Sequence, residues 1–220
     1  MSSSNSQSTK LSRTLTTILR HQAKNLGLTM SSDGFVSIKS LIALPMLSKL
    51  NPSQEKIEEI VKQCPKQRFA LSEDKTKIKA NQGHSIQEGL DDEKMLKEIK
   101  LDDDEKEFYL RYPTCIHGTY LKAWEAIQLS GGLSRMNRRH IHFSSKPPGA
   151  KTMISGMRAN AEILLHLDLK AAITDGYKFY ESQNEVILTA GDEKTGILPL
   201  QYIIKVEQQK KTSKINVTSS

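Results

Sequence analysis

An acidic stretch divides the sequence into two segments with different hydrophobic patterns. Residues 91–107 contain nine acidic and four basic residues, whereas the whole chain of 220 residues carries a net charge of +7. Apolar residues before the stretch recur mainly with a helical period, and those after it are typical of β-strands. We therefore predict an α+β protein with lobes at residues 11–90 and 108–207 and an acidic linker at 91–107.

The rest of the chain carries a positive surplus, which suits a polyanionic partner such as RNA but does not by itself identify one. Residues 1–10 and 208–220 have few apolar side chains, and we expect two disordered tails. The N-terminus lacks a secretory signal, and no apolar run reaches the roughly 18 residues of a membrane span. Only two cysteines are present, Cys64 and Cys115. We expect buried thiols in an intracellular protein of the nucleus or cytoplasm.

The first segment predicts helices followed by a β-hairpin. Four apolar residues share one helix face: Leu11, Leu15, Ile18 and Leu19. The opposite face is polar and mostly basic: Arg13, Thr17, Arg20 and Lys24. Asn51 and Pro52 predict the start of another helix, which ends near Pro65. Residues 68–71 and 77–80 predict a hairpin, so the segment is compatible with a winged-helix module.

The second segment predicts mostly strands, at residues 114–117, 140–144, 163–168 and 185–189. A helix at 121–129 is expected to end at Gly131-Gly132 and to bury three side chains: Leu121, Trp124 and Ile127. The strand at 140–144 alternates, so that Ile141 and Phe143 face the core. Its other face carries His140, His142 and Ser144. This polar face indicates either a cleft or a solvent-exposed surface.

Four short strings have residue types suited to binding an anion or a nucleotide: Arg20-His21, Asn81 to Ser85, His117-Gly118-Thr119 and Gly156-Met157-Arg158. Each string taken alone is also typical of an ordinary polar surface. The phosphate-binding loop of NTPases and the dinucleotide fingerprint are both missing, which argues against those two classes. The two histidines of the 140–144 strand have no neighbouring cluster of metal ligands, so we expect no metal.

The order and spacing of the strings resemble the tRNA 2′-phosphotransferase family from about Leu11 to Ile203. The matching strings are Leu19-Arg20-His21, Gln67-Arg68-Phe69, Ala80-Asn81-Gln82-Gly83-His84-Ser85, His117-Gly118-Thr119, Arg138-Arg139-His140-Ile141-His142-Phe143-Ser144 and Gly156-Met157-Arg158. The run from Ala80 to Ser85 is the most specific of them. The resemblance implies a winged-helix-like RNA lobe followed by an NAD lobe of the ADP-ribosyltransferase type.

The resemblance also implies roles for individual residues. Its catalytic set falls on Arg20, His21, Arg68 and Arg158. Its NAD site falls on His117, Gly118, Thr119, His142 and Ser144. We expect contacts with RNA from Arg13, Lys24, Lys79, Asn81, Gln82 and His84. Two positions depart from the family pattern, because many members have Arg at Lys79 and Gly at Glu185.

The implied reaction has two steps. An internal RNA 2′-phosphate attacks the nicotinamide ribose of NAD, and nicotinamide leaves. The ADP-ribose 2″-hydroxyl of this ADP-ribosylated intermediate then attacks phosphorus, giving RNA with a 2′-hydroxyl and ADP-ribose 1″,2″-cyclic phosphate. Arginines suit the charge on the phosphoryl oxygens, and His21 is expected to bind phosphate and to protonate the departing 2′-oxygen.

Spliced tRNA is the natural substrate if splicing leaves a 2′-phosphate at the junction, which would make this the final step of tRNA splicing. The chain has no heptad seam, and we expect a monomer. Two alternatives remain open. One is an ADP-ribosyltransferase that acts on phosphorylated nucleic-acid ends and stops after the first step. The other is a non-catalytic RNA-binding module, although the intact catalytic set favours an enzyme.

Overall fold

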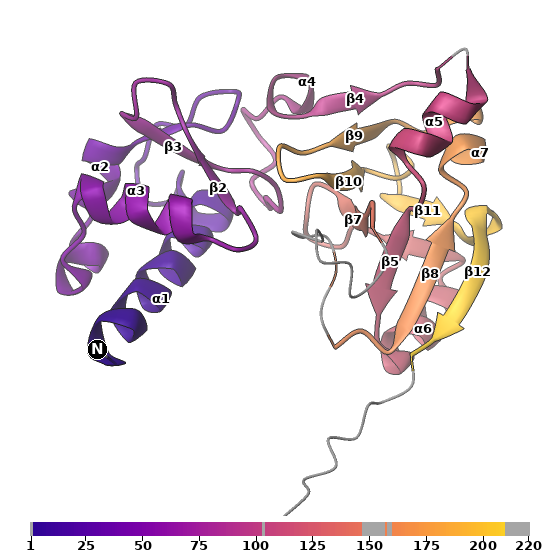
Figure 1. The fold of residues 1–220 in the computed structure, drawn as a ribbon, viewed down its shortest axis with the longest axis horizontal. Helices are drawn as coiled ribbons and strands as arrows, with labels where there is room; N and C mark the ends of the chain where they lie inside the picture. The colour runs from indigo at the N-terminus through magenta and orange to yellow at the C-terminus, as the bar shows by residue number, and fades with distance from the viewer. Residues whose placement is uncertain (1, 103, 147–156, 158–159, 210–220) are drawn as a thin grey trace, which may run out of the picture.

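The structure is a computed structural model that describes residues 2–102, 104–146, 157 and 160–209 (Figure 1). It contains both helices and sheets, as the sequence predicts, arranged in two lobes that lie side by side. The first lobe contains α1 (Ser2–Thr17), a π-helical turn (Ile18–Gln22), β1 (Val36–Ser37), α2 (Ile38–Ile42), a 3-10 helix (Pro45–Leu50), α3 (Gln54–Gln63), β2 (Phe69–Leu71) and β3 (Lys77–Ala80). Its three strands form an antiparallel sheet in the order β1-β3-β2.

The apolar stripe of the first helix is confirmed, because all four of its residues are almost completely buried: Leu11, Leu15, Ile18 and Leu19. The β2–β3 hairpin is confirmed as well. The expected helix start at Asn51 is wrong, because Asn51 ends the preceding 3-10 helix with a left-handed φ of 44°. Ser53 begins α3 instead, and its hydroxyl accepts a hydrogen bond from the backbone N–H of Lys56.

The second lobe is built on a seven-stranded sheet in the order β12-β8-β5-β7-β10-β9-β4. Its strands are β4 (Lys97–Ile99), β5 (Ile116–Thr119), β7 (Ile141–Ser144), β8 (Ile163–Leu167), β9 (Phe179–Glu181), β10 (Val186–Thr189) and β12 (Ile203–Gln208). A two-stranded ribbon pairs β6 (Gly132–Ser134) with β11 (Ile197–Pro199). The helices are α4 (Asp92–Met95), α5 (Glu105–Arg111), α6 (Leu121–Leu129) and α7 (Leu169–Thr174), and a 3-10 turn spans Leu200–Tyr202. The four predicted strands are present within a few residues of their expected bounds, and five other strands of this lobe were not predicted.

The acidic stretch at 91–107 differs from the predicted linker. It contains α4, the edge strand β4 and the start of α5, and β4 pairs with β9. Three apolar residues among the acidic ones are buried: Met95, Leu96 and Ile99. These side chains bury enough apolar surface to fold the stretch onto the sheet, and most of its described acidic side chains stay at the surface, with Asp92 as an exception.

Three further expectations differ from the structure. Residues 2–10, which we expected to be a disordered tail, are helical, because α1 begins at Ser2. The buried apolar residues later in the same helix, Leu11 and Leu15, anchor it in the core. Residues 210–220 lie outside the described part of the chain, and β12 ends at Gln208. In α6, Leu121 is 42% exposed and only Trp124 and Ile127 pack partly against the core. No helix within the described ranges has the length and apolar character that crossing a membrane requires.

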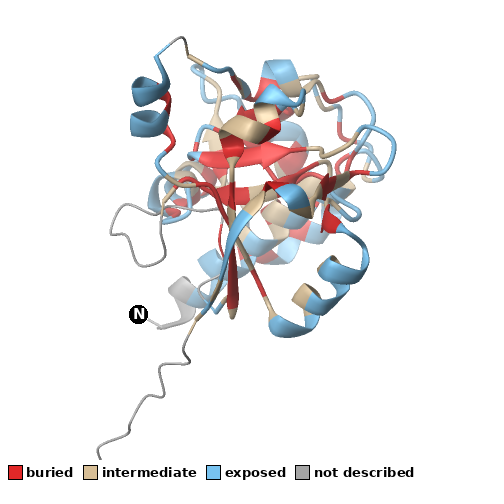
Figure 2. Cartoon of the chain, turned by 90° about the vertical axis from the view of Figure 1, so that its right-hand side faces the viewer, coloured by how far each residue is buried: buried red, intermediate tan, exposed pale blue. Residues whose placement is uncertain are grey.

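The two lobes share one hydrophobic core. Three residues of β9 and β10, Tyr180, Val186 and Leu188, belong to the same buried cluster as the apolar stripe of α1. A second cluster fills the other side of the seven-stranded sheet and includes Phe143, Leu165 and Phe179. Buried residues run through the central strands in Figure 2, and exposed residues lie mostly on the surrounding helices and turns. The shared core therefore holds residues of the two lobes at fixed positions.

We predict that Leu15→Ala destabilises the protein by about 2–5 kcal/mol, because it leaves a cavity in the shared core. Leu129→Ala on α6 is the matched control, since Leu129 is 90% exposed and Leu15 is 0% exposed. The free energy of unfolding from urea titration measures both effects. A loss below 1 kcal/mol for Leu15→Ala, or equal losses for the two variants, would contradict the prediction.

Candidate active site

Polar residues from both lobes meet where the segment after β3 passes the seven-stranded sheet. The side chain of Gln82 accepts a hydrogen bond at Oε1 from Nε2 of His142 on β7, at 2.9 Å. The carbonyl oxygen of His84 accepts from the backbone N–H of Arg139 at 2.9 Å. Asn184 donates from Nδ2 to the carbonyl oxygen of Lys66 at 3.0 Å. These contacts bring the Asn81 to Ser85 run of the first lobe against the histidine strand of the second.

Arg20 lies in the π-helical turn that follows α1. Such turns displace one residue from the regular helix and occur often at functional sites. The carbonyl oxygen of Arg20 accepts from the backbone N–H of Ser85 at 3.0 Å. Gly83 has a φ of +87°, and a Cβ atom there would lie 3.1 Å from the Arg20 guanidinium carbon. Glycine at this position therefore allows the backbone to lie against the guanidinium group.

The guanidinium of Arg20 is half-buried, and its Nε has no hydrogen-bond partner. Burial, followed by the charges of Arg138 and Arg68, lowers the pKa of Arg20 to about 10. Arg20 thus remains a cation at neutral pH. Among the described residues, the arginines in ion pairs are Arg111 and Arg139, so Arg20 has no carboxylate partner there. A bound anion would supply the missing negative charge.

His21 is exposed at the end of the same turn, and a hydrogen bond of 2.9 Å joins its Nδ1 to Oγ of Ser85. Burial of part of the ring and the charges of Arg20 and Arg138 lower the pKa of His21. The imidazole is therefore neutral at pH 7 in the protein as described. An anion placed beside these cations would raise that pKa again, because it would offset their positive charge.

Arg68 precedes β2, and three contacts fix its position. Its backbone N–H and its Nη1 each donate to Sγ of Cys64 at 3.5 Å, and its carbonyl oxygen accepts from the backbone N–H of Asn81 at 2.9 Å. The side chain of Asn81 also donates to the carbonyl oxygen of Gln67 at 2.7 Å. The charge of Arg68 contributes to the lowered pKa of Arg20, after burial and the charge of Arg138.

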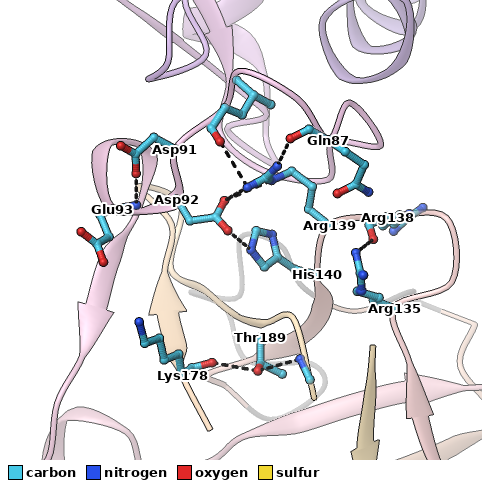
Figure 3. Close-up of polar contacts among 12 residues, drawn as sticks. Gln87, Asp91, Asp92, Glu93, Arg135, Arg138, Arg139, His140, Lys178 and Thr189 are labelled. Atoms are coloured by element: carbon cyan, nitrogen blue, oxygen red, sulfur yellow. Dashed lines mark hydrogen bonds and ion pairs between the residues drawn. The ribbon is translucent and has the colours of Figure 1, made fainter. Parts of the chain in front are cut away.

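Arg138 is a member of the site to which the sequence analysis gave no role. It is exposed in the loop between β6 and β7, where its backbone N–H donates to the carbonyl oxygen of Arg135 at 3.0 Å. Its own carbonyl oxygen accepts from Nη1 of Arg135 at 3.4 Å (Figure 3). Its charge lowers the pKa values of Arg20, His21 and His142. The signal for this role was present in the Arg138-Arg139-His140 string, but only the folded chain brings the loop back to Arg20.

His117 and His142 lie on the neighbouring strands β5 and β7. Nδ1 of His117 donates to the carbonyl oxygen of His142 at 2.9 Å. Burial is the main cause that lowers the pKa of His142 far below its usual range, and nearby positive charges contribute. His142 is therefore a neutral donor to Gln82, and its side chain belongs to the contact between the lobes.

The other three residues expected to bind NAD have structural contacts of their own. A Cβ atom on Gly118 would lie 2.5 Å from Cγ of Met157, so the glycine makes room for that side chain. Ser144 donates from Oγ to the carbonyl oxygen of Lys146 at 2.7 Å and accepts from the backbone N–H of the same residue at 3.2 Å. Thr119 is buried. The NAD-binding roles of Gly118, Thr119 and Ser144 stay predictions from the sequence.

The residues expected to contact RNA fall into two groups. Lys79 is buried with its ammonium group 4.9 Å from the centre of the Phe35 ring, which fits packing better than contact with RNA. Lys24 is exposed and pairs with Glu88 at 3.4 Å, and Arg13 is exposed on α1. Asn81, Gln82 and His84 are buried in the contact between the lobes.

Arg158 lies outside the described residues, so its catalytic role remains a prediction from the sequence.

Two other buried polar atoms of the Asn81 to Ser85 run also have no hydrogen-bond partner: Oδ1 of Asn81 and Nε2 of His84. Unsatisfied polar atoms are rare in protein interiors, and a group of them indicates a bound ligand or water. Burial, followed by the charge of Arg20, lowers the pKa of His84 to about 3, so its ring is neutral. No group of three potential metal ligands occurs among the residues that the structure describes.

Comparison with known proteins identifies the family of the chain. Residues 6–191 match the model of the RNA 2′-phosphotransferase, Tpt1 / KptA family. The tRNA 2′-phosphotransferase 1 of Danio rerio is 40% identical over 210 residues, which cover 93% of this chain and 88% of the relative. The protein of the same name from Homo sapiens is 38% identical over 209 residues, covering 93% and 78%. A probable RNA 2′-phosphotransferase of Fusobacterium nucleatum is 35% identical over 182 residues, covering 82% and 92%.

The chain therefore belongs to the RNA 2′-phosphotransferase family of enzymes, as its motifs predict.

The buried His84 predicts that stability falls in mild acid. The folded protein keeps His84 neutral down to a pKa of about 3, whereas the unfolded chain binds a proton below the ordinary value of 6.5. Stability should therefore drop by about 1.4 kcal/mol per pH unit between pH 6 and pH 4 on account of this residue. Urea unfolding of the wild type and of His84→Gln measures the difference in slope. An NMR titration of the His84 ring with a midpoint near 6.5 would contradict the prediction.

Proposed function

We propose that the protein removes an internal 2′-phosphate from RNA by transferring it to NAD. One observation carries the proposal: the guanidinium of Arg20 lies against the backbone of Gly83 with an unpartnered Nε and, among the described residues, no carboxylate partner, while the charges of Arg138 and Arg68 act on it. Membership of the RNA 2′-phosphotransferase family supports a phosphorylated RNA as the anion that binds there. Curated relatives are named tRNA 2′-phosphotransferase, so we further propose spliced tRNA inside the cell as the substrate.

In this proposal the guanidinium groups bind the non-bridging oxygens of the 2′-phosphate. Their paired N–H donors match phosphate oxygens, and their positive charge offsets the charge that builds up during phosphoryl transfer. The unpartnered Nε of Arg20 is one available donor. The unpartnered Oδ1 of Asn81 accepts hydrogen bonds, which suits a ribose hydroxyl beside the phosphate.

His21 would act on the same phosphate. Its Nδ1 is held by Ser85, which leaves Nε2 to contact the substrate. The dianionic phosphate would raise the lowered pKa of His21, so that the ring carries a proton only when substrate is bound. His21 could then protonate the 2′-oxygen as it leaves the phosphorus.

The residues around β5 and β7 fit NAD in part. When bound, NAD supplies the ribose hydroxyl that accepts the phosphoryl group. His117 is half-buried beside the contact between the lobes, and we assign it to binding NAD there. The nearby cations would reduce the repulsion between the pyrophosphate of NAD and the RNA phosphate. Gly118 and Ser144 are left out of this assignment because Met157 and Lys146 already contact them.

The lobe types proposed from the resemblance are supported by topology. The first lobe has the element order α1, β1, α2, α3, β2, β3 and a small antiparallel sheet, which suits a winged-helix-like RNA lobe. The second lobe is β-rich and carries the histidines proposed for NAD, which suits the ADP-ribosyltransferase type. Arg13 lies on the exposed face of α1 and would contact the RNA backbone away from the reacting phosphate.

The direct experiment incubates the protein with a short RNA that has one internal 2′-phosphate, with and without NAD. Mass spectrometry should show loss of the phosphate and formation of ADP-ribose cyclic phosphate only when NAD is present. An RNA that keeps its phosphate and gains ADP-ribose would identify a transferase that stops after one step. An RNA that is bound but unchanged would support the non-catalytic alternative.

We predict that Arg20→Lys lowers the single-turnover rate at saturating RNA by about 100-fold or more, because lysine keeps the charge but loses the paired donors. Arg111→Lys is the matched control, because Arg111 is exposed on α5 and pairs with Asp102, and its rate should stay within about twofold, as expected for a surface substitution. Quenched reactions with radiolabelled RNA give both rates. Near-normal turnover by Arg20→Lys would refute the role of the paired donors.

A second prediction concerns the glycine that contacts Arg20. Gly83→Ala should lower turnover by about tenfold or more, because the new Cβ would lie 3.1 Å from the guanidinium group and displace it. Gly27→Ala is the control, since Gly27 also has a positive φ, of +72°, but nothing lies within 4 Å of its added Cβ. Both variants have similar backbone strain, so equal losses of activity and stability would contradict the prediction.

A further inference from the structure

A buried cluster of charged side chains lies beside the proposed phosphate site (Figure 3). Oδ1 of Asp92 accepts from Nε of Arg139 at 3.1 Å and pairs with its Nη2 at 2.9 Å, and Oδ2 accepts from Nε2 of His140 at 3.0 Å. The side chains of Asp92, Arg139 and His140 are 21%, 13% and 6% exposed. One carboxylate thus holds two consecutive residues of the chain.

Arg139 is held by several further contacts. Its Nη1 donates to the carbonyl oxygen of Gln87 at 2.6 Å, and its Nη2 donates to that of Leu90 at 3.4 Å. Its backbone N–H donates to the carbonyl oxygen of His84. All three guanidinium nitrogens of Arg139 therefore have partners within the protein, so this arginine does not need a ligand to satisfy its donors.

Arg138 and Arg139 are neighbours with opposite environments. Arg138 is exposed and has no carboxylate partner among the described residues, whereas Arg139 is nearly buried. The contacts of Arg139 and His140 fix the backbone immediately after Arg138. They also fix the segment from His84 to Asp92, which continues from the run that contacts Arg20. Asp92 thus connects the loop that carries Arg138 to the segment that contacts Arg20.

Asp92 is ionised in this position. Burial acts to raise its pKa, but the hydrogen bond from His140 and the charges of His140 and Arg139 hold that pKa below its usual value. Loss of the carboxylate would leave the buried guanidinium of Arg139 without its counter-ion. The backbone around Arg138 would then lose the contact that sets its position.

We propose that Asp92 is a positioning residue for the phosphate site: by holding Arg139 and His140, it sets where Arg138 lies relative to Arg20. This inference rests on the proposed function, in which Arg138 and Arg20 bind the same 2′-phosphate. Asp92 itself does not touch the substrate. Its effect on phosphate recognition must therefore pass through Arg138.

A double-mutant cycle tests this dependence. The affinities of wild type, Asp92→Asn, Arg138→Ala and the double variant are measured for an RNA with one internal 2′-phosphate and for the same RNA with a 2′-hydroxyl. Fluorescence anisotropy of end-labelled RNA gives the ratio of the two affinities. Asp92→Asn should lower this preference by about tenfold in the wild-type background and by less than about twofold in the Arg138→Ala background.

Asp91→Ala is the matched control. Asp91 caps α4 by accepting from the backbone N–H of Glu93 at 3.0 Å, and its carboxylate pairs with Lys94, whereas that of Asp92 pairs with Arg139 and His140 (Figure 3). Its substitution should affect stability and leave the preference for phosphate unchanged. If Asp92→Asn does not fold, as judged by circular dichroism, Arg139→Lys takes its place in the cycle, because lysine loses the contacts with Gln87 and Leu90.

Equal losses of preference in the two backgrounds, or no loss in either, would overturn the positioning role. The cycle needs binding and not turnover, so it separates this inference from the proposed reaction. A wild type that prefers 2′-phosphorylated RNA without NAD-dependent transfer would refute the proposed function, and the cycle would still decide the role of Asp92. A wild type without that preference would overturn both.

Discussion

The burial of the Arg20 guanidinium beside the charges of Arg138 and Arg68 is the constraint on which the rest of the site depends. No described carboxylate pairs with these three groups, and burial, followed by the charges of Arg138 and Arg68, lowers the pKa of Arg20 to about 10. The energy that holds them together must come from elsewhere in the fold. The shared core supplies it, since Tyr180 and Val186 of the second lobe pack in the same cluster as the first helix.

Neutral histidines limit the charge of this region. Burial lowers the pKa values of His84 and His142, and the nearby arginines lower them further. The two imidazoles can therefore make hydrogen bonds in the site without adding positive charge. These buried neutral rings lower the free energy of unfolding at acidic pH, because the unfolded chain there binds protons that the folded chain does not.

Local sequence patterns predicted the elements that are stabilised by contacts between residues close together in the sequence. They failed for the elements and residues whose structure depends on contacts between residues far apart in the sequence. The stripe from Leu11 to Leu19 and the β2–β3 hairpin were predictable from periodicity, and the motif spacing predicted Arg20 and Arg68 as members of one family pattern. The edge strand β4 was missed because its acidic neighbours outweighed the few apolar residues that bury it. Arg138 received no role because its loop approaches Arg20 only in the folded chain. The contact of Ser144 with the backbone of Lys146 is a feature of the turn that the motif does not encode, and its NAD-binding role stays a prediction.

The turn between β9 and β10 illustrates how a departure from the family pattern is accommodated. Glu185 stands where many members have glycine, and its φ of 59° lies in the left-handed region, which costs about 1–2 kcal/mol for such a residue. Oγ of Ser145 donates to its carbonyl oxygen at 3.0 Å, and Lys146 pairs with its carboxylate, so both contacts offset the strain. The strained turn keeps the side chain of Asn184 directed at the carbonyl oxygen of Lys66, two residues before Arg68. A turn in the second lobe therefore helps to place the backbone that leads to Arg68 in the first.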